Sequence, residues 1–117
     1  MAEQPLASYE SVRRWKEGLA RQWGGDPLAE EPEKLEHLSR FLEHFGKDPD
    51  EAVAFCFLRR KETGERFASA KRREALVAEI RAFRDSAEET GLAARRLTSN
   101  VLSFFIHNGL LIDPAML

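Results

Sequence analysis

The sequence predicts an all-α protein, a compact bundle of four to five helices. Apolar residues recur at spacings of three and four along almost the whole chain, which is the period of an amphipathic helix. Serine, aspartate, proline and glycine stand at the ends of these periodic segments, where such residues cap or end helices. No segment shows the signals that are typical of strands and hairpins.

The first helix is expected to begin at Ser8 or Ser11 and to stop at Gly24-Gly25. Its apolar side would comprise Val12, Trp15, Leu19 and Trp23. The break that follows, G-G-D-P, leaves a second arrangement open, in which residues 1–25 form an arm that packs on another molecule. Two tryptophans expose too much apolar area for such an arm to stay free in water.

The second helix is expected to start at Pro32 and to end at Gly46. Its apolar stripe comprises Leu35, Leu38, Phe41, Leu42 and Phe45. Residues 48–51, D-P-D-E, supply an N-cap, a proline at the first helical position and a capping-box acid for a third helix. This third helix should run to about Glu62.

Thr63-Gly64 breaks the pattern, and Ser69 or a nearby residue opens the fourth helix. Its inward residues are Leu76, Val77, Ile80 and Phe83, and Gly91 is expected just past its end. A fifth helix lies between Leu92 and Leu111 and is closed by Gly109. Its core-facing stripe comprises Leu97, Val101, Phe104, Phe105 and Asn108.

A second stripe of the fifth helix is polar without being acidic, and comprises Arg96, Asn100, Ser103 and His107, with Arg95 and Ser99 beside it. Arginine, serine and asparagine are the donors that contact phosphates and base edges, so this face is a candidate DNA-binding surface. An ordinary solvated helix surface explains the same residues equally well.

A chain of 117 residues forms one domain and buries roughly two-thirds of its unfolded surface. The only cysteine, Cys56, excludes an internal disulfide and is expected to be a small buried side chain rather than a nucleophile. The chain shows no signal sequence and no apolar run that would span a bilayer, so we expect a cytoplasmic protein with no membrane partner.

The net charge of −2 argues against a general polyanion binder, but the charge is unevenly distributed. Residues 26–51 carry nine acids and three bases, whereas residues 59–96 carry eleven bases and seven acids. This polarity fits one face turned to nucleic acid. Attraction between an acidic and a basic element of the same chain would produce it as well.

The sequence contains no glycine-rich phosphate loop, catalytic triad order, CxxC pair or HExxH motif, so neither a catalytic residue nor a cofactor is expected. His37 and His44 share one helical face beside Glu36 and Glu43. A closed metal site needs about four ligands in fixed geometry, so a solvated helix flank is the favoured interpretation, and no metal is expected.

Three segments resemble the N-terminal core-binding domain of tyrosine recombinases, the SAM-like module of the phage-integrase family, over about residues 33–115. They are H-L-S-R-F-L-E-H-F-G-K-D-P-D-E-A (37–52), R-R-E-A-L-V-A-E-I-R-A-F (72–83) and E-E-T-G-L-A-A-R-R-L-T-S-N-V-L-S-F-F-I-H-N-G-L-L-I-D-P-A (88–115). The expected organisation is an N-terminal helix and loop, residues 1–31, followed by a SAM-like core-binding domain, residues 32–117. I-D-P-A is similar to the Asn-Pro-Ala linker of the family, with Asp113 in place of asparagine.

In that family the core-binding domain binds one side of duplex DNA, opposite the catalytic domain. The resemblance implies DNA contacts from Lys71, Arg72, Arg73, Arg95, Arg96, Ser99, Asn100 and Ser103. The family's catalytic arginines, His-x-x-Arg and tyrosine nucleophile have no room after Leu117, so the chain is not expected to be an enzyme on its own. The implied partners are double-stranded DNA and either a catalytic recombinase domain or a second copy of the chain. The alternative is a helical protein-interaction or dimerisation module that does not bind DNA, which the net charge favours.

Overall fold

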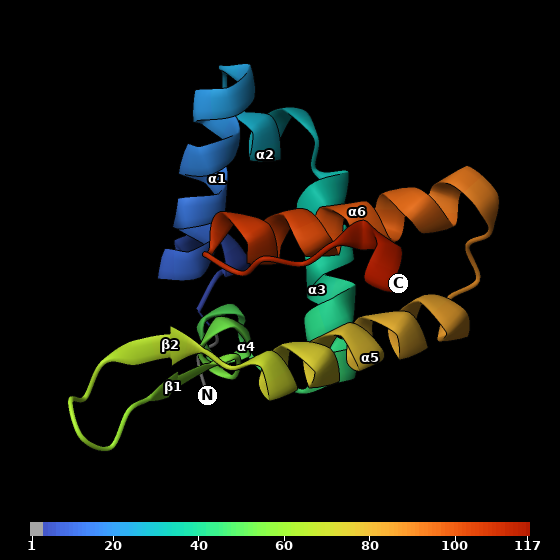
Figure 1. The fold of residues 1–117 in the computed structure, drawn as a ribbon. Helices are drawn as coiled ribbons and strands as arrows, with labels where there is room; N and C mark the ends of the chain where they lie inside the picture. Colours follow the sequence, from blue (N-terminus) through green and yellow to red (C-terminus); the bar gives the residue numbers. More distant parts are fainter. Residues whose placement is uncertain (1–3) are drawn as a thin grey trace.

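Helices make up most of the protein, and the last long helix crosses its centre (Figure 1). The computed structural model describes residues 4–117. Its elements are η1 (Leu6–Ser8), α1 (Glu10–Trp23), α2 (Pro27–Glu30), α3 (Glu33–Phe45), α4 (Pro49–Ala54), β1 (Phe57–Arg59), β2 (Arg66–Ala68), α5 (Ala70–Ser86), α6 (Gly91–His107) and η2 (Pro114–Met116). The prediction of a mainly helical protein is confirmed, with one short hairpin added. None of the helices in this part of the chain is long and apolar enough to cross a membrane.

The core forms around α6, because α1, α3 and α5 all pack on it. The fully buried residues of its apolar stripe are Leu97, Val101, Phe104 and Phe105. Phe104 meets Trp15 of α1 edge to face at 5.6 Å between ring centroids, and Phe105 meets Phe41 of α3 in the same way at 6.0 Å. Edge-to-face aromatic pairs add to the stabilisation that burial itself provides. The core-facing stripe of this helix is therefore confirmed.

The first helix is part of this core and is not an arm. Val12, Trp15 and Leu19 of α1 are buried in the same cluster as the residues of α6. Trp23 was expected on the same side, but its side chain is 75% exposed. It is the last residue of α1, beyond the part of the helix that α6 covers.

The start of α1 is tied to two other helices. Tyr9 stands at the N-cap position, so neither Ser8 nor Ser11 caps the helix. Ser11 instead donates from its backbone N–H and its hydroxyl to Oδ1 of Asp50 in α4, at 2.9 and 2.6 Å. Asn108, just after α6, donates to the carbonyl of Ser11 at 3.0 Å. These bonds fix the direction in which α1 enters the bundle.

The capping signals around α3 and α4 are confirmed. Gly46 ends α3 in the left-handed conformation, with φ of 73°. Asp48 then accepts from the backbone N–H of Glu51 at 2.8 Å, and the carboxylate of Glu51 accepts from the N–H of Asp48 at 3.0 Å. This reciprocal capping box opens α4 as predicted.

The expectation that the third helix runs to Glu62 is wrong, because α4 ends at Ala54 and a β-hairpin follows. The antiparallel register pairs Phe57 with Ala68, Leu58 with Phe67 and Arg59 with Arg66. Aromatic residues on both strands favour extended backbone. Gly64, with φ of 71°, provides the turn between the strands. We refer to residues 57–68 as the hairpin arm.

The boundary between α5 and α6 also differs from the prediction. Ser69 caps α5, its hydroxyl accepting from the N–H of Arg72 at 3.2 Å, as the sequence indicated. α5 ends at Ser86, however, and Gly91 is the first residue of α6 rather than the stop of α5. Ala87 has extended backbone, with ψ of 153°, and this ends the helical path before Gly91 is reached.

The residues after α6 turn back across α5 and α6 (Figure 1). Leu110 and Ile112 are buried in the core. Arg73 of α5 donates to the carbonyl of Leu111 at 3.2 Å, and Arg84 donates to that of Leu117 at 3.1 Å. The C-terminal segment is thus held along α5 through its backbone.

Candidate nucleic-acid interface

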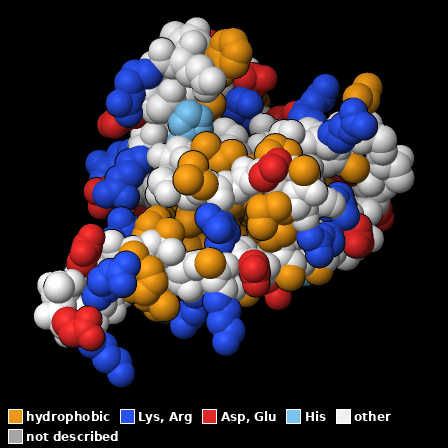
Figure 2. Space-filling view, viewed as in Figure 1, with side chains coloured by type: hydrophobic (Ala, Val, Ile, Leu, Met, Phe, Trp, Pro, Cys, Tyr) orange, Lys and Arg blue, Asp and Glu red, His pale blue; other side chains and the backbone are white. Residues whose placement is uncertain are grey.

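The most basic part of the protein is the hairpin arm together with the start of α5. Residues 59–73 carry seven basic and two acidic side chains. Figure 2 shows Lys and Arg side chains along the hairpin and beneath the adjoining end of α5, with the acids of the hairpin among them. Because β2 leads through Ser69 directly into α5, the two elements form one continuous surface.

Three arginines of this surface lie over aromatic rings. The pairs, with the distance from guanidinium carbon to ring centroid, are Arg60 over Phe67 at 4.9 Å, Arg66 over Phe57 at 3.7 Å and Arg72 over Phe55 at 4.8 Å. A guanidinium that stacks on a ring is held in place while its N–H edges stay available to an acceptor. The rings therefore orient three cations without neutralising them.

Residues 71–73, the α5 cluster, were predicted to contact DNA, and they fall into two kinds. Lys71 and Arg72 are exposed, and within residues 4–117 neither forms an ion pair. Arg73 is half-buried, and it donates to the carbonyl of Leu111 in the C-terminal segment. Lys71 is therefore open to an anion. Arg72 donates from Nη1 to the carbonyl of Phe55 at 3.4 Å and keeps its other donors available, whereas Arg73 helps to hold the chain together.

The start of α6 offers a second, smaller group of donors. Arg95 and Ser99 are exposed, and their side chains have no hydrogen-bond or ion-pair partner in the part of the chain that the structure describes. Arg96 is exposed as well, but its Nε lies 3.5 Å from a carboxylate oxygen of Glu33 on α3. An exposed pair of this kind contributes little stability and is screened by salt.

Asn100 and Ser103, both predicted to contact DNA, bond to other helices of the protein, and Asn100 is buried. Asn100 is only 5% exposed and Ser103 is half-buried. The hydroxyl of Ser103 accepts a hydrogen bond from the indole Nε1 of Trp15 at 3.0 Å. The polar stripe of α6 faces α1 and α3. The helical period predicts which residues share a face of α6, but it does not predict which other helix packs on that face. The side chains of Asn100 and Ser103 join helices in this structure, and a DNA contact from either residue stays a prediction.

Asn100 belongs to a polar network with two residues of α3. Lys34 Nζ lies 3.2 Å from Asn100 Oδ1, and Asn100 Nδ2 lies 2.9 Å from Nδ1 of His37. An ammonium can only donate, so Oδ1 faces Lys34 and Nδ2 donates to His37, whose Nδ1 must then carry no proton. His37 is 7% exposed, so the expectation of a solvated histidine flank is wrong for this residue.

No group of three or more His, Cys, Asp or Glu side chains among residues 4–117 is arranged to hold a metal ion. His44, the other histidine of the predicted pair, lies 3.2 Å from a carboxylate oxygen of Glu79 on α5. Cys56 is fully buried, as expected, and burial raises the pKa of its thiol to about 11. Such a thiol is a poor nucleophile at neutral pH.

Carboxylates within the acidic residues 26–51, and Glu89 outside them, are engaged in local contacts. Arg40 of α3 donates to both carboxylate oxygens of Glu89 at 2.5 and 2.9 Å, which lowers the pKa of Glu89 to about 2. Asp48 and Glu51 form the capping box of α4, and Asp50 binds Ser11. These carboxylates therefore do not cover the cations of the hairpin arm.

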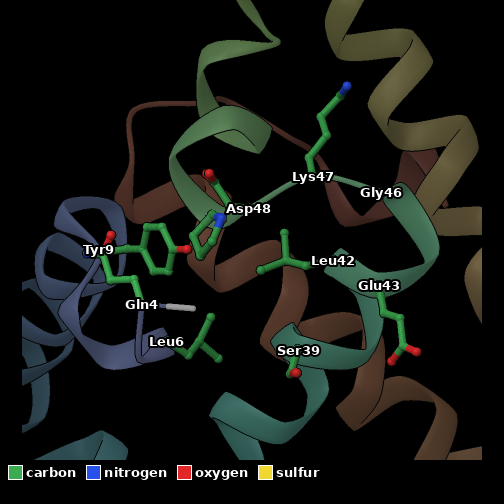
Figure 3. A pocket seen from close by; sticks show the side chains of 10 residues that line it. Gln4, Leu6, Tyr9, Ser39, Leu42, Glu43, Gly46, Lys47 and Asp48 are labelled. Atoms are coloured by element: carbon green, nitrogen blue, oxygen red, sulfur yellow. The ribbon is translucent and has the colours of Figure 1, made fainter. Parts of the chain in front are cut away.

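A cleft of about 670 Å³ lies between η1, the end of α3 and the start of α4. Figure 3 shows Leu6, Tyr9 and Leu42 around it, with Glu43 and Lys47 pointing outward at its rim. Asp48 is engaged in the capping box, and Lys47 Nζ lies over the rings of Phe45 and Phe55 at 5.3 and 5.4 Å. Ser39 also lines the cleft, and among residues 4–117 no hydrogen bond joins its hydroxyl to a carboxylate or a histidine.

The two basic groups lie at opposite ends of the antiparallel pair of α5 and α6 (Figure 1). α5 has 17 residues and is about 25 Å long at 1.5 Å per residue, and because the α5 cluster lies in its first turn and Arg95 in the second turn of α6, the two groups are no more than this distance apart along the helix axis. At 3.4 Å per base pair this distance equals about seven base pairs. The groups do not form one pocket, but both can lie against one duplex.

No family model, curated protein or solved structure matches this chain.

Proposed function

We propose that this protein is a duplex-DNA-binding module that acts as a core-binding domain of the tyrosine-recombinase type, in the cytoplasm. One observation carries the proposal: residues 59–73 have a net charge of +5, and Arg60, Arg66 and Arg72 are held over aromatic rings with N–H edges unneutralised by carboxylates among residues 4–117. Arginines held in this way suit the phosphates of a nucleic acid.

The net charge of the whole chain is compatible with DNA binding. The net charge of −2 includes carboxylates that cap helices or bind arginine, such as Glu51 and Glu89. The field that a duplex meets depends on the nearest charges, because charges beyond about 8–10 Å are screened at physiological salt.

In this proposal Lys71, Arg72 and Arg95 bind phosphates, Ser99 adds a neutral donor, and Arg96 joins them when its pair with Glu33 opens. Asn100, Ser103 and Arg73 support the surface from within. We also propose that the helical domain has the SAM-like fold of core-binding domains, which the order of the three resembling segments supports. The module itself is proposed to be non-enzymatic, and a recombinase catalytic domain would supply strand cleavage.

The test is a titration of labelled duplex, long enough to span both basic groups, with measurement of fluorescence anisotropy between ~50 and ~200 mM salt. Four phosphates neutralised by Lys71, Arg72, Arg95 and Arg96 would give a slope of log K against log salt of about −3.6. Absence of binding at ~50 mM salt, with the protein shown to be folded by circular dichroism, would contradict the proposed function.

A second candidate, a protein-interaction or dimerisation module, is favoured by a different surface. Ile106 and Leu111 are 43% and 81% exposed, and they border a groove of about 420 Å³ beside the C-terminal segment. Exposed apolar side chains that cluster at a groove are typical of binding sites for other proteins. Sedimentation of the wild type and of Leu111→Glu separates this candidate from a DNA-binding monomer, because only a dimer would dissociate on substitution.

A further inference from the structure

The hairpin arm extends away from the helices, and it is not part of the core (Figure 1). Every residue of the turn, 60–65, is exposed, and so are Leu58, Arg59, Arg66 and Ala68 in the strands. A two-stranded hairpin without a covering layer is marginally stable by itself in water. Phe57 and Phe67 are half-buried. The part of the hairpin arm that extends beyond these two residues therefore adds nothing to the packing of the described structure.

Arg59 and Arg66 are directly opposite each other in the two strands, with their side chains on one face of the ribbon. Like charges at directly opposed positions destabilise a pair of strands. No carboxylate among residues 4–117 forms an ion pair with either arginine. An acceptor from another molecule, placed between the two guanidinium groups, would turn this repulsion into attraction.

The two arginines are held near this position by contacts within the arm. Arg59 Nη1 donates to the carbonyl of Gly64 at 3.0 Å, which leaves its other donors available. Arg66 lies 3.7 Å above the ring centroid of Phe57, which is two residues from Arg59 on the same face of β1. Binding a ligand would thus require little loss of side-chain freedom, because these rotamers are already restricted.

The width of the ribbon selects between the two grooves of DNA. Paired strands lie about 4.8 Å apart, and side chains extend the ribbon further on each face. The major groove, about 12 Å wide, admits a two-stranded ribbon, whereas the minor groove is about 6 Å wide. The floor of the major groove presents O6 and N7 of guanine, two acceptors that match one guanidinium, and phosphates line its walls.

We infer that the hairpin arm enters the major groove of duplex DNA, with Arg59 and Arg66 directed to guanine O6 and N7 and to the flanking phosphates. This inference rests on the proposed function, since it assumes that the α5 cluster and the start of α6 hold the same duplex. It adds a groove-reading element to a surface that otherwise contacts only the backbone. The arm would therefore give the module a preference among sequences.

The test uses the whole chain and two duplexes of one guanine-containing sequence, one normal and one in which 7-deazaguanine replaces guanine and removes the N7 acceptor. The wild type should bind the normal duplex about tenfold or more tightly, as expected for loss of a bidentate contact. Methylation of guanine N7 should also be reduced over a few consecutive base pairs when the protein is bound. A duplex RNA, whose deep major groove excludes side chains, should bind more weakly than the DNA.

The variant Arg59→Gln/Arg66→Gln should lose both the protection of N7 and the discrimination against 7-deazaguanine, while it keeps salt-dependent binding through the α5 cluster. Lys61→Gln is the matched control, because it removes one charge from the exposed turn and leaves the opposed arginines intact. It should retain the protection. A second variant, in which Asn-Gly replaces residues 59–66 and so removes both arginines together with the turn, should behave as the double substitution does.

The outcomes separate the inference from the proposed function. Binding of the wild type without N7 protection, or equal affinity for both duplexes, would overturn groove entry and leave DNA binding standing. Tighter binding to duplex RNA or protection of the minor groove alone would also overturn it. Absence of any binding at ~50 mM salt would remove the proposed function and the inference together.

Discussion

Trp15 of α1 and Ser103 of α6 are joined by a hydrogen bond of 3.0 Å from the indole Nε1 to the hydroxyl oxygen. The indole is fully buried, and Ser103 is the only acceptor that its Nε1 has among residues 4–117. This single bond explains why a serine on the polar stripe of α6 faces a tryptophan rather than solvent.

Replacement of Ser103 by alanine should lower the free energy of unfolding by about 1–3 kcal/mol, because a buried N–H would lose its acceptor. Urea denaturation measures this change. Ser99→Ala, one turn earlier and exposed, is the control and should alter stability by less than about 0.5 kcal/mol. A loss of DNA affinity in a Ser103→Ala protein of unchanged stability would contradict the structural role.

Gly18 of α1 lies against α6, since a Cβ at this position would collide with the imidazole of His107. Alanine normally stabilises a helix interior by about 1 kcal/mol relative to glycine. Gly18→Ala should give no such gain in the wild type, because the imidazole has to move. In a His107→Ala background the same substitution should give the full stabilisation. Thermal unfolding of the wild type, the two single variants and the double variant measures the coupling energy between Gly18 and His107. Equal effects in both backgrounds would show that the two helices are not in contact there.

The pair of Arg40 and Glu89 predicts a pH dependence in the acid range. The pKa of Glu89 is lowered to about 2 from 4.5, so its contribution to stability is fully present above pH 4.5 and is lost as the pH falls toward 2. The melting temperatures of the wild type and of Glu89→Gln should differ by a constant amount above pH 5 and converge below it. Glu88→Gln, at a neighbouring exposed position, should not show this convergence.

The surface of α6 that we propose to bind DNA predicts different results for neighbouring residues. Arg95→Gln should weaken duplex binding and reduce the salt slope by about one unit, because it removes one phosphate contact. Asn100→Ala should lower stability and leave the affinity of the folded protein unchanged, since Asn100 is buried between Lys34 and His37. Arg21→Gln, an exposed cation on α1, serves as the control for loss of charge. A salt slope altered equally by Arg95→Gln and Arg21→Gln would argue against a defined face.

The sequence predicts correctly the structural features that depend on residues close together in the chain. The capping box at Asp48 and Glu51, the cap at Ser69 and the buried stripe of α6 are all recognisable within a single helical segment. The hairpin arm was not recognised, because three-residue strands carry little periodicity and the segment follows a strong helix start. Its aromatic residues and Thr-Gly turn were the available signals.

The positions of the residues proposed to bind DNA are less predictable from the sequence than the helices are. A helical period shows that Asn100, Ser103 and His107 share one face, but the packing of α1 decides that this face is covered. Arg95 and Ser99 lie on the uncovered side of the same helix. Distinguishing the two faces requires knowledge of which distant segment packs on α6, and the sequence of α6 does not contain it.

The two strands of the hairpin arm pair only with each other, so each has an outer edge whose backbone groups can pair with another strand. In solution, such edges can pair with the same edge of a second molecule and form a longer sheet, which is a first step in aggregation. Arg59, Arg60, Lys61 and Arg66 give both edges the same charge and make approaching copies repel each other. Variants that neutralise this arm are therefore expected to be less soluble, and storage at low concentration would help to keep them monodisperse.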